Sequence, residues 1–148
     1  DENFLIMART DIRAVEGLDA AIDRAKALVD AGADAVFPEA MRTLAEFEAM
    51  AAALDVPILA NMTEFGKSEL FSVDQLRDAG VNLVIWPVSL LRISMGAAGR
   101  ALDTLNEEGH LTSALSEMQH RADLYDLIDY ESYNHFDSGV FNFTTTKE

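Results

Sequence analysis

Cysteine is absent from the 148 residues of this chain. Disulfide bonds, thiolate metal ligands and a cysteine nucleophile are therefore excluded within these residues. Basic residues are scarce too: 11 Lys and Arg stand against 26 Asp and Glu, which gives a formal net charge of −15 at pH 7. Because clustered Lys and Arg are needed to neutralise a phosphate backbone, this balance argues against a nucleic acid partner.

No apolar run approaches the roughly 20 residues that a membrane-spanning helix needs. The chain also opens without the basic and apolar segments of a secretory leader, so we expect neither membrane insertion nor secretion. His110, His120 and His135 share no metal-ligand spacing, and no Asp-x-Asp cluster follows a predicted strand. We therefore predict that this chain holds no metal ligands.

What the sequence does contain is four short apolar runs that each end in polar residues. These runs, predicted to be strands, are residues 4–8, 35–38, 58–60 and 82–86. Helical patterns separate and follow them, over residues 18–30, 43–54, 75–79 and 90–107. Strands that alternate with helices in this way predict an α/β fold with a parallel sheet.

Four such units amount to half of a (β/α)₈ TIM barrel, which takes about 250 residues. A flavodoxin-like sheet is the rival, but it usually needs five strands and a ligand-binding first loop, and here that loop is Arg9-Thr10-Asp11. We therefore expect residues 1–110 to form a half barrel. Residues 111–148 are predicted to be a C-terminal helical extension that packs on the barrel or on a neighbouring subunit.

Polar residues at the ends of the strands are the candidate site, because parallel strands bring their carboxyl ends to one mouth. They are Arg9, Glu39, Asn61, Thr63 and Ser89. Arg9 has the fork geometry to hold a carboxylate, or it forms a structural salt bridge with Glu39. Asn61 and Thr63 suit carboxylate recognition, although such a pair is also common as turn caps.

At this point the residues resemble a known family. Residues 7–11, 14–22, 37–40, 57–66 and 124–130 are similar, in the same order, to the 2-methylisocitrate lyases. These enzymes belong to the isocitrate lyase and phosphoenolpyruvate mutase superfamily, whose fold is a (β/α)₈ barrel. The resemblance implies that this chain is the second half of the barrel.

The resemblance also implies an activity, a Mg²⁺-dependent retro-aldol cleavage of 2-methylisocitrate to pyruvate and succinate. It would serve cytoplasmic propionate breakdown (the methylcitrate cycle) in a homo-oligomer, a tetramer in the family. The small tricarboxylate substrate would be bound at the positions that match the family's motifs. These are Arg9, Glu39, Asn61, Met62, Thr63, Arg92 and Arg121. Spacing alone makes Arg92 and Arg121 ordinary helix-surface cations.

The departure from the family is equally informative. Its catalytic cysteine and its metal-binding aspartates belong to the other half of the barrel, so no catalytic residue and no Mg²⁺ ligand is expected here. We therefore predict that this chain is a C-terminal half, lacking the first half, and is inactive alone. Three alternatives remain: an isocitrate lyase, a phosphonomutase-like enzyme, and a non-catalytic half-barrel partner.

Overall fold

The computed structural model describes residues 1 and 3–140 and divides the chain into two compact units. The first, Asp1–Met95, is called the strand unit, and the second, Gly96–Glu148, the helical unit. The division falls inside helix α5 (Ser89–Glu108), whereas the sequence predicted a boundary between residues 110 and 111. The packing predicted for residues 111–148 stays a prediction.

Four parallel strands run through the strand unit. They are β1 (Met7–Thr10), β2 (Ala35–Pro38), β3 (Leu59–Asn61) and β4 (Leu83–Ile85). β1 pairs with β2 and β3 with β4, and a parallel bridge between Val36 and Ile58 links the two pairs. Each strand is thus the neighbour of the next strand in the chain. The predicted α/β class is confirmed.

Strand β1 begins later than the sequence predicted. Residues 4–8 were expected, but pairing runs from Met7, beside Ala35, to Thr10, beside Pro38. The apolar run alone did not predict the bounds of β1, because pairing with a parallel neighbour decides where a strand begins and ends. Arg9 therefore lies within β1 rather than after it.

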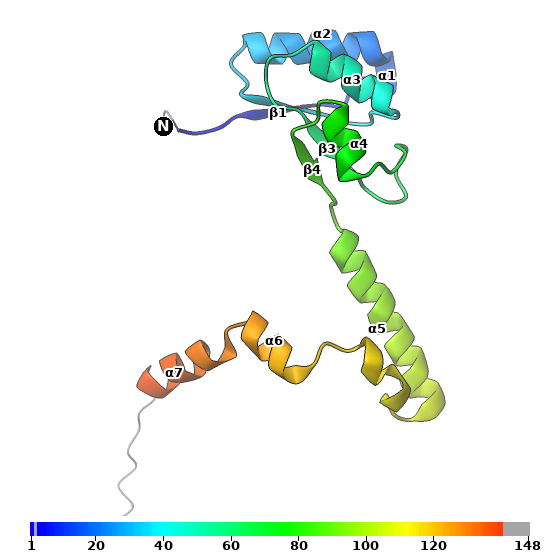
Figure 1. The fold of residues 1–148 in the computed structure, drawn as a ribbon, viewed down its shortest axis with the longest axis vertical. Helices are drawn as coiled ribbons and strands as arrows, with labels where there is room; N and C mark the ends of the chain where they lie inside the picture. The colour runs from blue at the N-terminus through cyan, green and yellow to red at the C-terminus, as the bar shows by residue number, and fades with distance from the viewer. Residues whose placement is uncertain (2, 141–148) are drawn as a thin grey trace, which may run out of the picture. The chain divides into compact units, whose positions relative to one another are not determined.

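Helices cover one face of these strands. They are α1 (Arg13–Glu16), α2 (Leu18–Asp30), α3 (Leu44–Ala52) and α4 (Val73–Asp78). Helix α2 has the predicted bounds and packs against β1 and β2 (Figure 1). The sequence analysis missed α1, a single turn between β1 and α2.

The core of the strand unit lies between those helices and the strands. Its largest buried side chains include Val36, Phe47, Met50, Ile58 and Leu76. Successive strand residues point to opposite faces, and the other face remains open within the described residues. Its exposed apolar side chains include Met7, Leu83 and Ile85.

Two glycines follow the ends of helices in the left-handed backbone region. Gly32, with φ 104°, follows α2, and Gly80, with φ 85°, follows α4. After α4 the N–H of Gly80 donates to the carbonyl oxygen of Arg77 at 2.9 Å. The N–H of Val81 donates to the carbonyl oxygen of Leu76, also at 2.9 Å. This is a Schellman motif, which a left-handed glycine completes.

Thr43 and Glu46 have the spacing of a capping box, which forms only in half. The Thr43 hydroxyl accepts from the Glu46 N–H, but the Glu46 carboxylate turns to other partners. It accepts from the backbone N–H of Arg42 and from two guanidinium nitrogens of Arg13. An Arg–carboxylate fork is stronger than the cap it replaces, so Glu46 ties the α1 turn to α3.

The Arg13–Glu46 pair predicts an acid-sensitive contribution to stability. Its side chains are only 14% and 15% exposed. Burial would raise the pKa of Glu46, but hydrogen bonds from Arg13 and from the Arg42 N–H lower it below its ordinary value. The contribution is therefore full above the ordinary carboxyl pKa of about 4.3 and is lost as pH falls through the lower folded pKa.

Glu46→Gln should lower the free energy of unfolding at pH 7 by about 1.5–3 kcal/mol, the usual range for a hydrogen-bonded charge. The difference from the unaltered protein should shrink below pH 4. Urea unfolding followed by the fluorescence of Trp86, the single tryptophan, measures both. Glu48→Gln, at an exposed position of α3, is the matched control. A difference that grew on acidification would contradict the prediction.

The helical unit contains no strand over its described residues 96–140. The predicted helical pieces appear as a 3₁₀ helix, η1 (Thr112–Glu117), followed by α6 (Arg121–Leu127) and α7 (Tyr130–Val140). Residues 138–148 hold apolar side chains among polar ones, from which we expect a partner to order them, but most of them, residues 141–148, lie outside the described residues. No described helix is long and apolar enough to cross a membrane.

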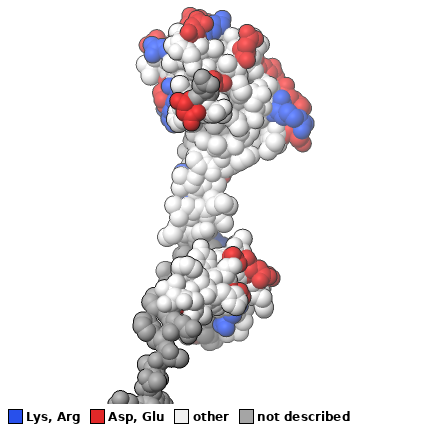
Figure 2. Space-filling model, turned by 90° about the vertical axis from the view of Figure 1, so that its left-hand side faces the viewer, with Lys and Arg blue, Asp and Glu red and all other residues white. Residues whose placement is uncertain are grey.

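Charged side chains are dispersed over the strand unit. On the face in Figure 2, Asp and Glu occur in several separate places, and Lys and Arg lie among them as isolated groups. This face offers no continuous basic stripe of the kind that a phosphate backbone requires.

Candidate functional site

Three non-glycine residues adopt left-handed backbone angles in the loops that leave the strands. Ala40 follows β2 with φ 63°, Phe65 follows β3 with φ 62°, and Val88 follows β4 with φ 66°. A branched residue such as Val88 is rare in this region, and such strain clusters at functional sites. The polar residues adjacent to them in sequence are Glu39, Glu64 and Ser89.

Arg9 is held by two carboxylates at the end of β1. Its Nε and Nη2 donate to the two oxygens of Asp11 at 3.1 and 2.9 Å, and Nη2 lies 3.3 Å from Glu39 Oε2. Its guanidinium also lies 4.8 Å from the centre of the Phe37 ring. The hydrogen bond from Arg9 lowers the pKa of the Asp11 carboxyl. The structural salt bridge considered from the sequence is present, and Asp11 is a partner that the sequence did not indicate.

Glu39 connects this arginine to the next strand. Asn61, the last residue of β3, donates its Nδ2 to Glu39 Oε2 at 3.3 Å. The Asn61 Oδ1 atom is buried and accepts no hydrogen bond from the described residues. A buried acceptor without a donor costs about 1–3 kcal/mol, so a ligand or water that supplies a donor is favoured here.

A second cluster surrounds Arg92 between the ends of β3 and β4. Arg92 Nη1 lies 3.3 Å from Thr63 Oγ1, 3.3 Å from the Glu64 carbonyl oxygen and 3.2 Å from Glu64 Oε2. The Ser89 hydroxyl donates to the Glu64 carboxylate, with both oxygens at 2.7 Å. That hydrogen bond is the main reason that the pKa of Glu64 lies below its ordinary value.

The predicted site residues thus fall into three groups. Arg9, Glu39, Asn61, Thr63 and Arg92 line the carboxyl ends of the strands. Met62 lies between two of them, but its side chain is fully buried in the core, where its sulfur is 3.4 Å from the Phe71 N–H nitrogen. Arg121 is the first residue of α6, in the helical unit.

Sequence reasoning missed Glu64, although a signal was present. Glu64 directly follows Thr63 in the polar segment after β3, and Ser89 stands at the corresponding place after β4. Two polar residues after adjacent parallel strands are expected to meet.

The described residues do not fit a Mg²⁺ ion. They contain no group of three or more His, Cys, Asp or Glu side chains placed to hold a metal. Asp11 and Glu39 are each paired with Arg9, and Glu64 is paired with Arg92. Carboxylates that already neutralise arginines are poor ligands for a hard cation that needs anionic oxygens. What these strand ends offer to a ligand is instead the N–H groups of Arg9 and Arg92 that the ion pairs and hydrogen bonds among the described residues do not use.

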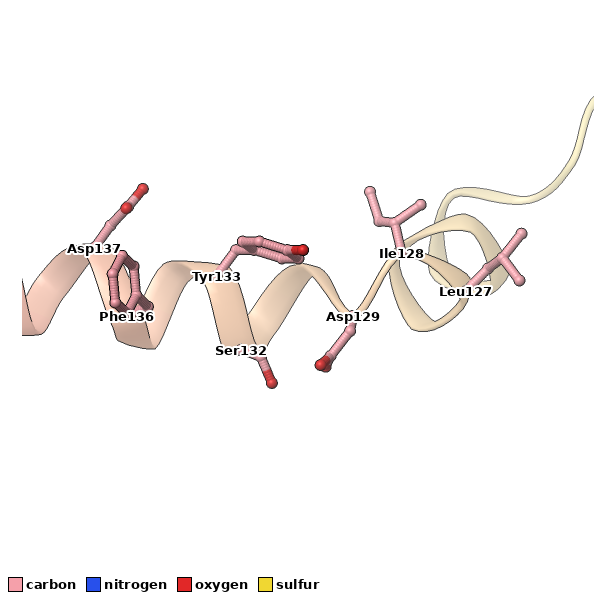
Figure 3. Close-up of a pocket in the computed structure, with 7 residues that line it drawn as sticks. All are labelled: Leu127, Ile128, Asp129, Ser132, Tyr133, Phe136 and Asp137. Atoms are coloured by element: carbon pink, nitrogen blue, oxygen red, sulfur yellow. The ribbon is translucent and has the colours of Figure 1, made fainter. Parts of the chain in front are cut away.

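Two hollows in the described structure differ in the charged groups that line them. One, of about 360 Å³, lies against the Arg92 cluster and is lined by Glu64, Phe65, Ser89, Arg92 and Ile93. The other, of about 570 Å³, lies in the helical unit and is lined by the seven residues of Figure 3, among them Tyr133, Phe136, Asp129 and Asp137. The second has two carboxylates and no cation in its lining, so only the first suits an anionic ligand.

The chain is similar to known enzymes over nearly its whole length. It is 53% identical over 144 residues to a probable 2-methylisocitrate lyase 2 of Corynebacterium glutamicum, covering 97% of this chain and 47% of the relative. It is 50% identical over 133 residues to a 2-methylisocitrate lyase of Escherichia coli strain K12, covering 90% of this chain and 45% of the relative. The chain therefore spans about half the length of the curated relatives it matches.

The fold is similar to that of solved enzymes. A structure of oxaloacetate acetylhydrolase in complex with the inhibitor 3,3-difluorooxalacetate superposes with a TM-score of 0.79 at 26% identity. The match covers 93% of this chain and 46% of the other. The family model described as phosphoenolpyruvate phosphomutase matches residues 1–106. The resemblance stated from the sequence is confirmed, and the chain belongs to the phosphoenolpyruvate phosphomutase family.

Proposed function

We propose that this chain supplies the carboxylate-binding half of a carbon–carbon lyase that cleaves 2-methylisocitrate to pyruvate and succinate. One observation carries the proposal: at the ends of the strands Arg9 is held by two carboxylates and Arg92 by one, and among the described residues these partners leave part of each guanidinium free. Asp11 and Glu39 use the Nε and Nη2 atoms of Arg9, and the partners of Arg92 use only its Nη1. The remaining N–H groups are available for substrate carboxylates.

Each residue has a specific task in this proposal. Arg9 and Arg92 neutralise and orient two carboxylates of the substrate, which several arginines can do in a site with little water. Asn61 Oδ1 accepts a hydrogen bond from the substrate hydroxyl. The Thr63 hydroxyl donates a hydrogen bond to a substrate carboxylate. Glu39 fixes Arg9 and Asn61. Met62 contributes by anchoring the segment in the core, and Arg121 is kept as a substrate-binding residue on the resemblance to the family alone.

The proposed reaction needs chemistry beyond these residues. The substrate hydroxyl loses its proton, its carbon becomes the ketone of pyruvate, and the electron pair of the broken C–C bond stays on the succinate carbon, which then takes up a proton. The family resemblance implies Mg²⁺ and a cysteine acid for these steps. The described residues offer no group of side chains that could hold Mg²⁺, and the sequence has no cysteine. We therefore propose that the Mg²⁺ ligands and the cysteine come from the other half of a (β/α)₈ barrel.

The strand order supports the barrel half of the proposal. A flavodoxin-like sheet would place β1 between β2 and β3, whereas here neighbours follow the order of the chain, as in a barrel. The uncovered strand face, with Leu83 and Ile85 exposed, would become the barrel interior. For the helical unit we keep the proposal that it packs on the barrel or on a neighbouring subunit of a tetramer, in the cytoplasm.

The test is pyruvate release from 2-methylisocitrate. We expect activity from the full-length protein that carries this chain, in the presence of Mg²⁺, and none above background from the 148 residues alone. Isocitrate and phosphonopyruvate as substrates separate the isocitrate lyase and phosphonomutase-like alternatives. If the full-length protein cleaved none of the three substrates, the proposal would be overturned in favour of a non-catalytic half barrel. The lack of a metal-ligating group of side chains among the described residues agrees with that alternative.

A further inference from the structure

We propose that Glu64 is a positioning residue that sets the substrate-binding orientation of Arg92, and that Ser89 holds Glu64 in place. The inference rests on the proposed function of Arg92 and extends it to two residues that lie outside the predicted substrate-binding set. Glu64 lies in the loop after β3 and Ser89 is the first residue of α5, and the Ser89 hydroxyl oxygen lies 2.7 Å from both carboxylate oxygens of Glu64.

The contacts of Arg92 show how this works. Its three hydrogen bonds all use one nitrogen, Nη1, and two of their acceptors belong to Glu64, the carbonyl oxygen and Oε2. A guanidinium has five N–H donors in a rigid plane, so fixing one nitrogen fixes the direction of the others. The N–H groups of Nε and Nη2 are then directed together at an incoming carboxylate.

The Arg92–Glu64 pair is more than an ordinary surface ion pair. Both side chains are partly exposed, at 40% and 31%, and such a pair alone contributes little to stability. The serine, however, is buried, and its hydroxyl donates to the carboxylate. Glu64 is thus held by two residues of α5, Ser89 and Arg92, which restricts the rotamers of Arg92 that retain the ion pair.

The backbone on both sides of this contact is unusual. Phe65 follows Glu64 and Val88 precedes Ser89, and both have left-handed φ values, of 62° and 66°. Neither is a residue that adopts this region without cost. The two loops therefore keep a strained conformation at the two points that bring Glu64 and Ser89 together, as expected of a positioning contact.

The test is a double-mutant cycle on the full-length protein, with 2-methylisocitrate as substrate. Glu64→Gln keeps the shape but turns an amide N–H toward Arg92, so we expect KM to rise about 10-fold with kcat within about 3-fold. Ser89→Ala should raise KM about 3-fold. In an Arg92→Ala background, Glu64→Gln should have no further effect on KM, because Glu64 acts only through Arg92.

Glu69→Gln removes the same charge from an exposed position in the same β3–α4 connection and should leave KM unchanged. Additive effects of Glu64→Gln and Arg92→Ala, or an unchanged KM in Glu64→Gln, would overturn the positioning role. If Arg92→Ala itself left KM unchanged, the proposed function of Arg92 would fail first. If the Glu64→Gln protein does not fold, Glu64→Asp is the second variant. Because it keeps the negative charge, its KM is expected to lie close to that of the unaltered protein.

Discussion

Arg9→Lys is expected to lower kcat/KM for 2-methylisocitrate about 100-fold in the full-length protein, equivalent to about 2.7 kcal/mol of transition-state stabilisation. Lysine keeps the positive charge, so a loss of this size would come from geometry. Arg9 holds Asp11 through Nε and Nη2 and approaches Glu39 through Nη2. A single ammonium group cannot hold both carboxylates and also present N–H groups to a substrate.

The fold of the protein should be unaffected by this change. The side chain of Arg9 is 51% exposed, so its ion pairs contribute little to stability. Arg77→Lys, at an arginine of α4 that likewise lies near two aspartates, is the matched control and should leave kcat/KM unchanged. Steady-state pyruvate release measures both variants. An Arg9→Lys enzyme with full activity would show that Arg9 is only the structural salt bridge that the sequence also allowed.

The sequence alone went far toward the fold because local signals and tertiary structure agree in this chain. Helix α2 has the predicted bounds, Leu18–Asp30, since its apolar spacing and the helix-ending Gly32 shortly after it indicate the same segment. Strand ends were predicted less well. β1 and β3 both run later than their apolar runs, because pairing with a parallel neighbour decides which residues join the sheet.

The candidate site was predictable by residue type but not by contact. Arg9, Glu39 and Asn61 were expected to converge because parallel strands end at one edge, and an ion pair from Arg9 to Glu39 and a hydrogen bond from Asn61 to Glu39 connect them. Which carboxylate holds which arginine was beyond sequence reasoning. The bonds of Glu64 to Ser89 and Arg92 span 25 and 28 residues, and no local pattern announces them.

The same limit applies to the uncovered face of the strands. Alternation in β4 places Leu83 and Ile85 on one side and Val84 on the other, and Val84 packs against the core. Such alternation indicates that both faces of the strand are apolar. It does not indicate what covers the face opposite to the helices. The length of the relatives, about twice that of this chain, adds to the strand order as a reason to propose further strands.

Gly80→Ala should have the largest effect on stability, lowering the free energy of unfolding by about 2–4 kcal/mol. Two causes add. Gly80 has φ 85°, where an L side chain is strained by about 1–2 kcal/mol. A Cβ on Gly80 would also lie 2.7 Å from the Cβ of Ala51, which belongs to the rigid α3 helix. Because α3 is fixed by the buried Phe47 and Met50, it has little freedom to move away.

Gly32→Ala separates the two causes. Gly32 occupies the same position of a Schellman motif after α2, with φ 104°, but a Cβ there would meet nothing within 4 Å. It should therefore cost only the backbone strain, about 1–2 kcal/mol. Urea unfolding followed by Trp86 fluorescence measures both variants. Equal losses would mean that α3 yields to the new methyl group, whereas a larger loss in Gly80→Ala, partly recovered by adding Ala51→Gly, would identify the α3–α4 contact as tightly packed.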